Sequence, residues 1–119
     1  MLRIPMTPLL SRLAQVALVA AGCIAFAVAI LPSGDGPSQY NDKLLHGLTF
    51  LLLGGLAIAA YRRRSSFGVI VVLTIFGGLI ELAQLVTDWG RSAELADLGA
   101  DMLGSMIGIV LARCITRKP

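Results

Sequence analysis

The sequence predicts an all-α polytopic membrane protein, a four-transmembrane-helix bundle with both termini cytoplasmic. Hydrophobic residues make up 56% of the 119 residues and charged residues only 14%, whereas a soluble domain carries about a quarter charged residues. Four apolar stretches each approach the ~20 residues that cross a bilayer. Together with short loops they use the whole length, so we expect residues 1–119 to form a single transmembrane domain.

The four predicted spans cover about residues 13–31, 43–61, 67–87 and 94–114. The first follows Arg3 and Arg12, and a basic start before an apolar run also describes a secretory signal peptide. This run is longer than the apolar region of a signal peptide, about 7–15 residues, so we expect an uncleaved first helix. A Pro/Gly/Ser-rich loop over 32–42 ends that helix, and a turn over 88–91 joins the last two.

The distribution of basic residues predicts the orientation of the chain. Cytoplasmic loops carry an excess of Lys and Arg. The segments 32–43 and 88–94 contain only Lys43 and Arg91, so we expect them to face outward. The remaining basic residues lie at the two termini and between the second and third spans: Arg3, Arg12, Arg62, Arg63, Arg64, Arg113, Arg117 and Lys118. The net charge of +3 is thus a topological signal, and we expect no nucleic-acid partner.

Polar residues recur at helical spacing in the last three predicted spans. The three sets are Asp42 and His46; Gly77, Glu81, Gln84 and Asp88; and Asp97, Asp101, Gly104 and Gly108. Each set lies on one face of its helix. Ionisable residues inside a bilayer cost a few kcal/mol or more unless they are paired. We therefore expect the three faces to converge on a polar pocket open to the outside, with the first helix peripheral.

Depth within the membrane supports this convergence. At about 1.5 Å of rise per residue, Glu81 on the third span and Asp101 on the fourth both lie roughly 13 Å below the outer turn. The two residues therefore reach a similar depth in the membrane. Gly104 and Gly108 form a G-x-x-x-G motif, which lets helix backbones approach closely. Cys23 and Cys114 fall in or beside different spans at different depths, so we expect no disulfide.

The polar residues follow the order D-K-x-x-H, E-x-x-Q, G-R, D-x-x-x-[N/D] and G-x-x-x-G, at residues 42–46, 81–84, 90–91, 97–101 and 104–108. In this order and on these spans, the chain resembles the VanZ-like family of small bacterial membrane proteins. The resemblance implies a multi-pass protein of the bacterial cytoplasmic (inner) membrane with four to five helices. Through the family's namesake it also implies a link to teicoplanin resistance and the cell envelope. Asp101 departs from the family pattern, where Asn is more common, and adds a negative charge.

Two classes of function fit these residues. In the first, a binding or shielding module, Arg91 and Lys43 engage a membrane lipid or lipid-linked envelope component. In the second, a small intramembrane hydrolase or transferase, Arg91 stabilises phosphate charge, and the catalytic candidates are His46, Glu81 and Asp101. The full set of candidate ligand-binding residues is Asp42, Lys43, His46, Glu81, Gln84, Arg91, Asp97 and Asp101.

A purely structural role is the alternative at every position: helix caps, interhelical hydrogen bonds and salt bridges. One histidine among several carboxylates can hold Mg²⁺, Mn²⁺ or Zn²⁺, although no spacing matches a recognised metal motif. The absence of a nucleophile motif and of a phosphate-binding loop favours the binding module. A proton-coupled transporter is a third class, which would need an oligomer to build its path.

Overall fold

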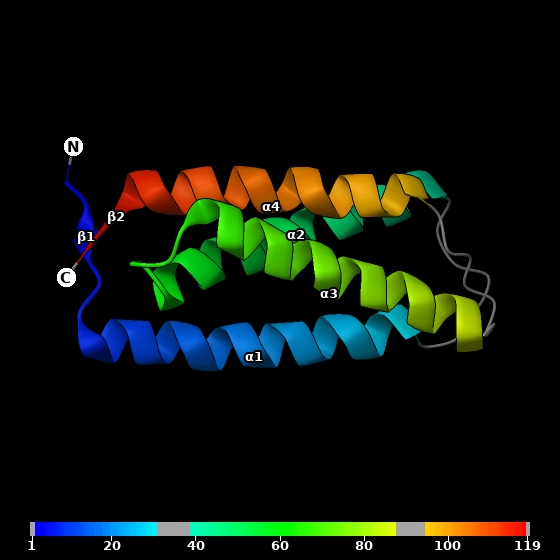
Figure 1. Ribbon diagram of the computed structural model, residues 1–119, viewed down its shortest axis with the longest axis horizontal. Helices are drawn as coiled ribbons and strands as arrows, with labels where there is room; N and C mark the ends of the chain where they lie inside the picture. Colours follow the sequence, from blue (N-terminus) through cyan, green and yellow to red (C-terminus); the bar gives the residue numbers. More distant parts are fainter. Residues whose placement is uncertain (1, 31–38, 88–94, 119) are drawn as a thin grey trace.

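Four helices run side by side along the long axis of the molecule (Figure 1). The computed structural model describes the backbone of residues 2–30, 39–87 and 95–118, and the side chains of the same residues apart from 39–43 and 87. The helices are α1 (Pro8–Ile30), α2 (Gln39–Ala60), α3 (Ser66–Thr87) and α4 (Leu95–Ile115). The long dimension of 45 Å matches a bilayer with its head groups, about 40–45 Å. The predicted all-α bundle is confirmed.

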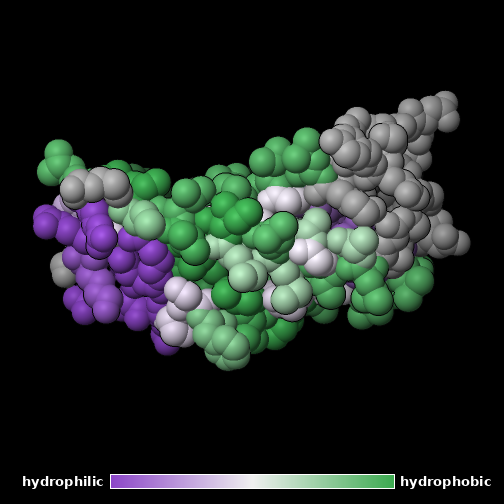
Figure 2. Space-filling view, turned by 90° about the horizontal axis from the view of Figure 1, so that it is seen from above, coloured by the Kyte–Doolittle hydropathy of each residue, from purple (hydrophilic) through white to green (hydrophobic). Residues whose placement is uncertain are grey.

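The surface of the bundle is that of a membrane protein. Helix α1 and the segments Ser66–Val86 and Leu95–Ile115 are long and apolar enough to cross a membrane, and α2 contains the shorter apolar segment Leu44–Ala60. Large hydrophobic side chains on all four helices are exposed, whereas hydrophilic residues gather at the end that holds both termini (Figure 2). That the basic end is cytoplasmic stays a prediction.

Two helices begin earlier than the predicted spans. Helix α1 starts at Pro8 because proline suits the first helical position and the Thr7 hydroxyl accepts a hydrogen bond from the Leu10 amide at 3.3 Å. Arg12 therefore lies inside the helix. Helix α2 starts at Gln39. Helix α3 begins next to Ser65, whose hydroxyl accepts a hydrogen bond from the Gly68 amide at 3.0 Å.

The chain ends meet in a short parallel pairing that the sequence did not suggest. Strand β1 (Ile4–Pro5) pairs with β2 (Thr116–Arg117), with Ile4 opposite Thr116 and Pro5 opposite Arg117. The Met6 amide extends the pairing by donating to the Arg117 carbonyl at 3.2 Å. This contact ties the segment before α1 to the end of α4.

The closest helix pair is α2 and α4, which have the most extensive contacts in the bundle. A Cβ added at Gly104 would overlap the Gly47 carbonyl, and one at Gly108 would overlap the Leu51 carbonyl. Gly54 makes the reciprocal contact, because a Cβ there would lie 2.6 Å from the Ser105 carbonyl oxygen. The predicted packing role of Gly104 and Gly108 is confirmed, and their partners are backbone atoms of α2.

The hydrophobic core lies among α2, α3 and α4. Phe50, Leu53, Ile58 and Ile80 are almost completely buried. Helix α1 covers this core from outside: only Ala14 is buried among its residues, and it packs on α2 and α3.

Two glutamines attach α1 to the rest of the bundle. The Gln15 amide donates to the Ala60 carbonyl at 3.3 Å, and the Gln84 amide donates to the Ala29 carbonyl at 2.9 Å. The peripheral position predicted for the first helix is thus observed, with one hydrogen bond from Gln15 in its first half and one to Ala29 near its C-terminal end.

At the basic end, Arg113 on α4 binds the loop between α2 and α3 and the first residue of α3. Its guanidinium donates to the Arg62 carbonyl at 3.1 Å, the Arg64 carbonyl at 2.6 Å and the Ser66 hydroxyl at 2.9 Å. Arg62 in turn donates to the hydroxyl and carbonyl of Thr116, at 3.0 and 3.3 Å. The residue pattern predicts a role in orientation for these arginines, and the structure adds a bracing role for two of them.

The Gly104–Gly47 contact predicts a sharp difference between two glycines of α4. Gly104→Ala should destabilise the protein by about 1 to 3 kcal/mol, because the new methyl group forces the α2 and α4 backbones apart. Gly99→Ala is the control, since a Cβ there meets nothing within 4 Å. Thermal unfolding in detergent measures both variants. Equal melting temperatures would contradict the close packing.

The Arg113 contacts predict that lysine cannot replace this arginine. A lysine ammonium lacks the planar fork that reaches three acceptors at once. Arg113→Lys should therefore lower stability by about 1 to 3 kcal/mol through the lost charged hydrogen bonds. Arg63→Lys serves as the control, because Arg63 is exposed and donates no hydrogen bond within the described ranges. The melting temperature in detergent should fall for the first variant only.

Candidate functional site

Ionisable side chains from three helices meet near the end of the bundle away from the termini. His46 comes from α2, Glu81 from α3, and Asp97 and Asp101 from α4. We call these four residues the polar cluster. Helical spacing explains the α4 pair, because residues four apart lie on the same face.

The imidazole of His46 lies between the two aspartates. Its Nδ1 is 2.9 Å from Oδ1 of Asp101, a hydrogen-bond distance, and its Nε2 is 3.9 Å from Oδ2 of Asp97. Both carboxyl groups are buried, with Asp101 1% and Asp97 2% exposed. Each ring nitrogen thus faces a carboxylate, and the ring is held from both sides.

Glu81 completes the cluster from α3. One of its carboxylate oxygens and donor atoms of His46 and Asp101 all lie within 4.8 Å of one another. Gly77, one turn before Glu81, makes this approach feasible: a Cβ there would lie 2.9 Å from Oδ2 of Asp101. The Gly77 position therefore leaves space for the Asp101 carboxylate against α3.

The balance of charges sets what the cluster can hold. The described part of the site brings three carboxylates to a single imidazole. Charges buried away from water are costly unless they are paired or coordinate a metal. Because carboxylate oxygens accept hydrogen bonds and bind cations, the described atoms of the cluster suit a proton, a cation or a ligand that donates hydrogen bonds.

Gln84 is not part of the polar cluster and donates its hydrogen bond to α1. It is 2% exposed, and its amide nitrogen binds the Ala29 carbonyl of α1. Its Oε1 atom is buried and has no hydrogen-bond partner within the described part of the chain. The structure thus shows the interhelical hydrogen bond that was the structural alternative for Gln84, and a ligand role for it stays a prediction.

Three other candidate side chains lie outside the described ones. Arg91 falls in the undescribed segment between α3 and α4, and Asp42 and Lys43 belong to α2 with only their backbone described. The structure therefore brings together His46, Glu81, Asp97 and Asp101. That Lys43 and Arg91 line the same pocket stays a prediction.

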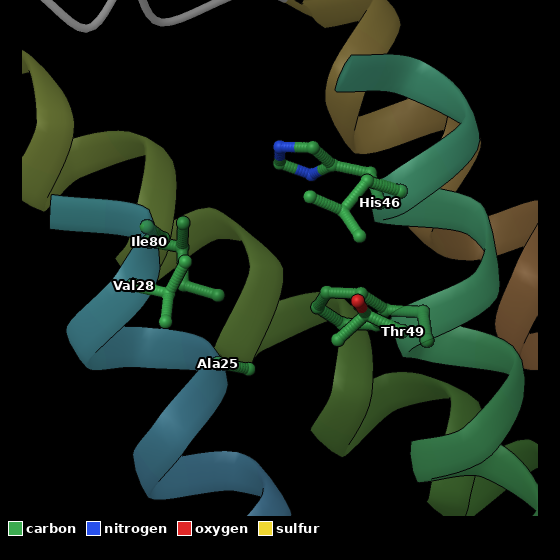
Figure 3. A pocket seen from close by; sticks show the side chains of 8 residues that line it. Ala25, Val28, His46, Thr49 and Ile80 are labelled. Atoms are coloured by element: carbon green, nitrogen blue, oxygen red, sulfur yellow. The ribbon is translucent and has the colours of Figure 1, made fainter. Parts of the chain in front are cut away.

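A small cavity of about 60 Å³ adjoins the polar cluster at His46. Figure 3 shows it between α1, α2 and α3, with Ala25 and Val28 on one side, Ile80 beside them, and His46 and Thr49 opposite. Apart from His46 and Thr49, its lining is apolar. The histidine ring thus contacts the carboxylates of the polar cluster and also borders an apolar space.

Sequence reasoning missed the contribution of α1 to this cavity. Ala25, Val28 and Ala29 line it, although the first span carries no polar face and was expected only to pack at the periphery. Small apolar residues give no signal in a single sequence, because alanine and valine at a ligand cavity look the same as alanine and valine facing lipid.

Comparison with known proteins adds the family. A family model described as VanZ/LLP1 matches residues 11–116, nearly the whole chain. Neither a curated protein nor a solved structure matches. The match covers the polar cluster, the Gly104 and Gly108 contacts and α1. The chain therefore belongs to the VanZ family, as the order of its motifs predicted.

Proposed function

We propose that this protein is a binding module of the bacterial cytoplasmic membrane, whose polar cluster holds or shields the head group of a lipid-linked or cell-envelope molecule. The observation that carries the proposal is the position of His46, which borders both the buried carboxylates and the apolar cavity. A site with one polar and one apolar wall suits an amphipathic ligand.

The size of the cavity limits how much of such a ligand it contains. A volume of about 60 Å³ is well below the roughly 300–1,000 Å³ of typical small-molecule pockets. Only a small part of a ligand, next to His46 and Thr49, can rest inside. The remainder would lie along the exposed apolar surfaces of α1 and α3, helices long and apolar enough to cross a membrane.

Charge narrows the class of head group. The carboxylates of the polar cluster repel a phosphate, so a phosphate must be bound by other groups. The sequence offers Lys43 and Arg91 on the outward side, and arginine binds phosphate oxygens in a bidentate manner. We propose that these two residues hold the phosphate, while the polar cluster accepts hydrogen bonds from hydroxyl or amine groups of the same head group.

A second candidate function, an intramembrane hydrolase or transferase acting on a lipid phosphate or envelope precursor, rests on the His46–Asp101 contact. A carboxylate 2.9 Å from one imidazole nitrogen orients the ring and leaves the other nitrogen to act as a general base. Here the other nitrogen faces Asp97 at 3.9 Å. A substrate would have to enter between His46 and Asp97 to reach this nitrogen. For this reason we favour the binding module over the enzyme.

Filling the cavity should weaken binding of an amphipathic probe. In Val28→Trp the larger ring occupies space beside His46, so we expect binding of a short-chain polyprenyl phosphate to weaken at least about tenfold, the equivalent of ~1.4 kcal/mol. Val19→Trp is the control, because Val19 is 65% exposed on the same helix. Fluorescence binding to the full chain in nanodiscs measures both. Equal affinities of the Val28→Trp and Val19→Trp variants would show that the cavity is not part of the binding site.

The cellular role can be tested through the same residues. Glu81→Gln and Asp101→Asn keep side-chain size and remove a charge each. If the protein acts in envelope defence, both variants should abolish the difference in teicoplanin susceptibility between cells that contain the protein and cells that lack it. The expression level in the membrane is the control. A susceptibility difference that persists with both variants argues against this role.

The two candidate functions make different predictions for His46→Gln. A binding module should lose affinity for the polyprenyl phosphate probe and release no inorganic phosphate with either protein. An enzyme should release phosphate from the probe in the wild type and lose that release in the variant. A phosphate assay on purified protein separates them.

A further inference from the structure

We propose that His46, Glu81 and Asp101 bind a divalent metal ion between α2, α3 and α4. Donor atoms of the three residues come from three separate helices and lie within 4.8 Å of one another. All three proposed ligands belong to the part of the chain whose side chains the structure describes.

The distances suit coordination by one ion. Ligand atoms about 2.1 Å from a metal lie about 3.0 Å apart at a right angle and about 4.2 Å apart across the ion. Nδ1 of His46 and Oδ1 of Asp101 are 2.9 Å apart, which matches two neighbouring ligands. The outer limit of 4.8 Å exceeds the opposite-ligand distance by about half an ångström. It exceeds the ligand spacing of about 3.4 Å in tetrahedral Zn²⁺ sites by about 1.4 Å, so the ligands must move closer together when an ion binds.

Gly77 explains how α3 approaches the Asp101 carboxylate so closely. A side chain on α3 at this position would meet the carboxylate of Asp101, since a Cβ added there would lie only 2.9 Å from its Oδ2 atom. The neighbouring Gly78 has nothing within 4 Å of such a Cβ. Only the glycine that faces the cluster thus leaves room for Asp101 beside Glu81.

Charge and burial favour a cation at this place. Asp101 is 1% exposed and Asp97, 3.9 Å from the other ring nitrogen, is 2% exposed. A divalent ion neutralises two carboxylates and requires the imidazole nitrogen that binds it to be deprotonated. Asp97 lies 3.9 Å from the second ring nitrogen, so it must approach by about 1 Å to accept the hydrogen bond that usually orients a metal-bound histidine.

The donor set indicates which ion binds. Imidazole favours Zn²⁺ and other transition metals, whereas carboxylates also suit Mn²⁺ and Mg²⁺. With one nitrogen and two carboxylate ligands, we expect Zn²⁺ to bind more tightly than Mn²⁺, and both more tightly than Mg²⁺. Of the three proposed ligands, His46 also lines the cavity; a role for the ion in binding a phosphate there rests on the proposed function.

The test measures metal binding to the full chain without any lipid probe. Protein purified in detergent is stripped with a chelator, dialysed, and titrated with Zn²⁺ and with Mn²⁺, using calorimetry, elemental analysis and Mn²⁺ electron paramagnetic resonance. We expect stoichiometric binding to the wild type. Glu81→Gln and Asp101→Asn should weaken it by about 10- to 100-fold or more.

Matched glycine variants separate a specific site from a general loss of fold. Gly77→Ala should weaken Zn²⁺ binding at least about tenfold, by analogy with changes beside metal ligands, and Gly78→Ala should leave it unchanged. Ser105→Ala is a further control, because the Ser105 hydroxyl donates only to the Asp101 carbonyl of its own helix. Circular dichroism checks that all variants are folded.

The outcomes distinguish this site from the proposed function. Substoichiometric binding to the wild type, or equal affinity in wild type, Glu81→Gln and Asp101→Asn, overturns the metal site. If the metal binds and the polyprenyl phosphate probe does not, the site stands and the head-group function fails. If the probe binds equally well to chelator-stripped protein that takes up no metal, the metal site fails and the head-group function stands.

Discussion

The backbone contact between α2 and α4 is the constraint on which the rest of the molecule depends. Gly104 lies against the Gly47 carbonyl, and these two glycines are the near neighbours of Asp101 and His46 in their helices. Because the two backbones touch, the imidazole reaches the carboxylate at 2.9 Å. Larger residues at this crossing would push the two helices apart and would also move His46 away from Asp101. The same backbone contact therefore sets both the helix packing and the geometry of the polar cluster.

The bundle buries carboxylates beside its apolar core and exposes many large apolar side chains along its helices. Asp97 and Asp101 are buried, whereas leucine, isoleucine and valine side chains on all four helices are exposed. Hydrophobic residues cover the middle of the face that Figure 2 shows. In a bilayer this arrangement keeps the carboxylates out of contact with lipid and places the apolar faces against the lipid chains. Glu81, His46 and the aspartates therefore depend on one another, because each supplies part of the polar surroundings that the membrane cannot.

Much of the architecture could be predicted from residue patterns. Long apolar segments separated by short polar ones gave the four helices, and the spacing of Asp97 and Asp101 with Gly104 and Gly108 gave the correct inner face of α4. The sets on α2 and α3 converged with it at His46 and Glu81. Helix starts were less accurate, since Thr7 and Pro8 begin α1 before the apolar run. The binding of Arg113 to the loop between α2 and α3 was not foreseen, because a basic residue at a membrane edge already has an adequate explanation in topology.

What the sequence by itself determined is the helical membrane class, the inward faces of three helices and the family. These follow from local periodicity and composition, which need only neighbours along the chain. The tertiary structure decided which carboxylate reaches which imidazole nitrogen, that Gln84 donates to α1 while Glu81 joins the cluster, and that Ala25 and Val28 line a cavity. Such contacts depend on the rotation and crossing of whole helices, and shifts of a few ångströms there leave the residue pattern unchanged.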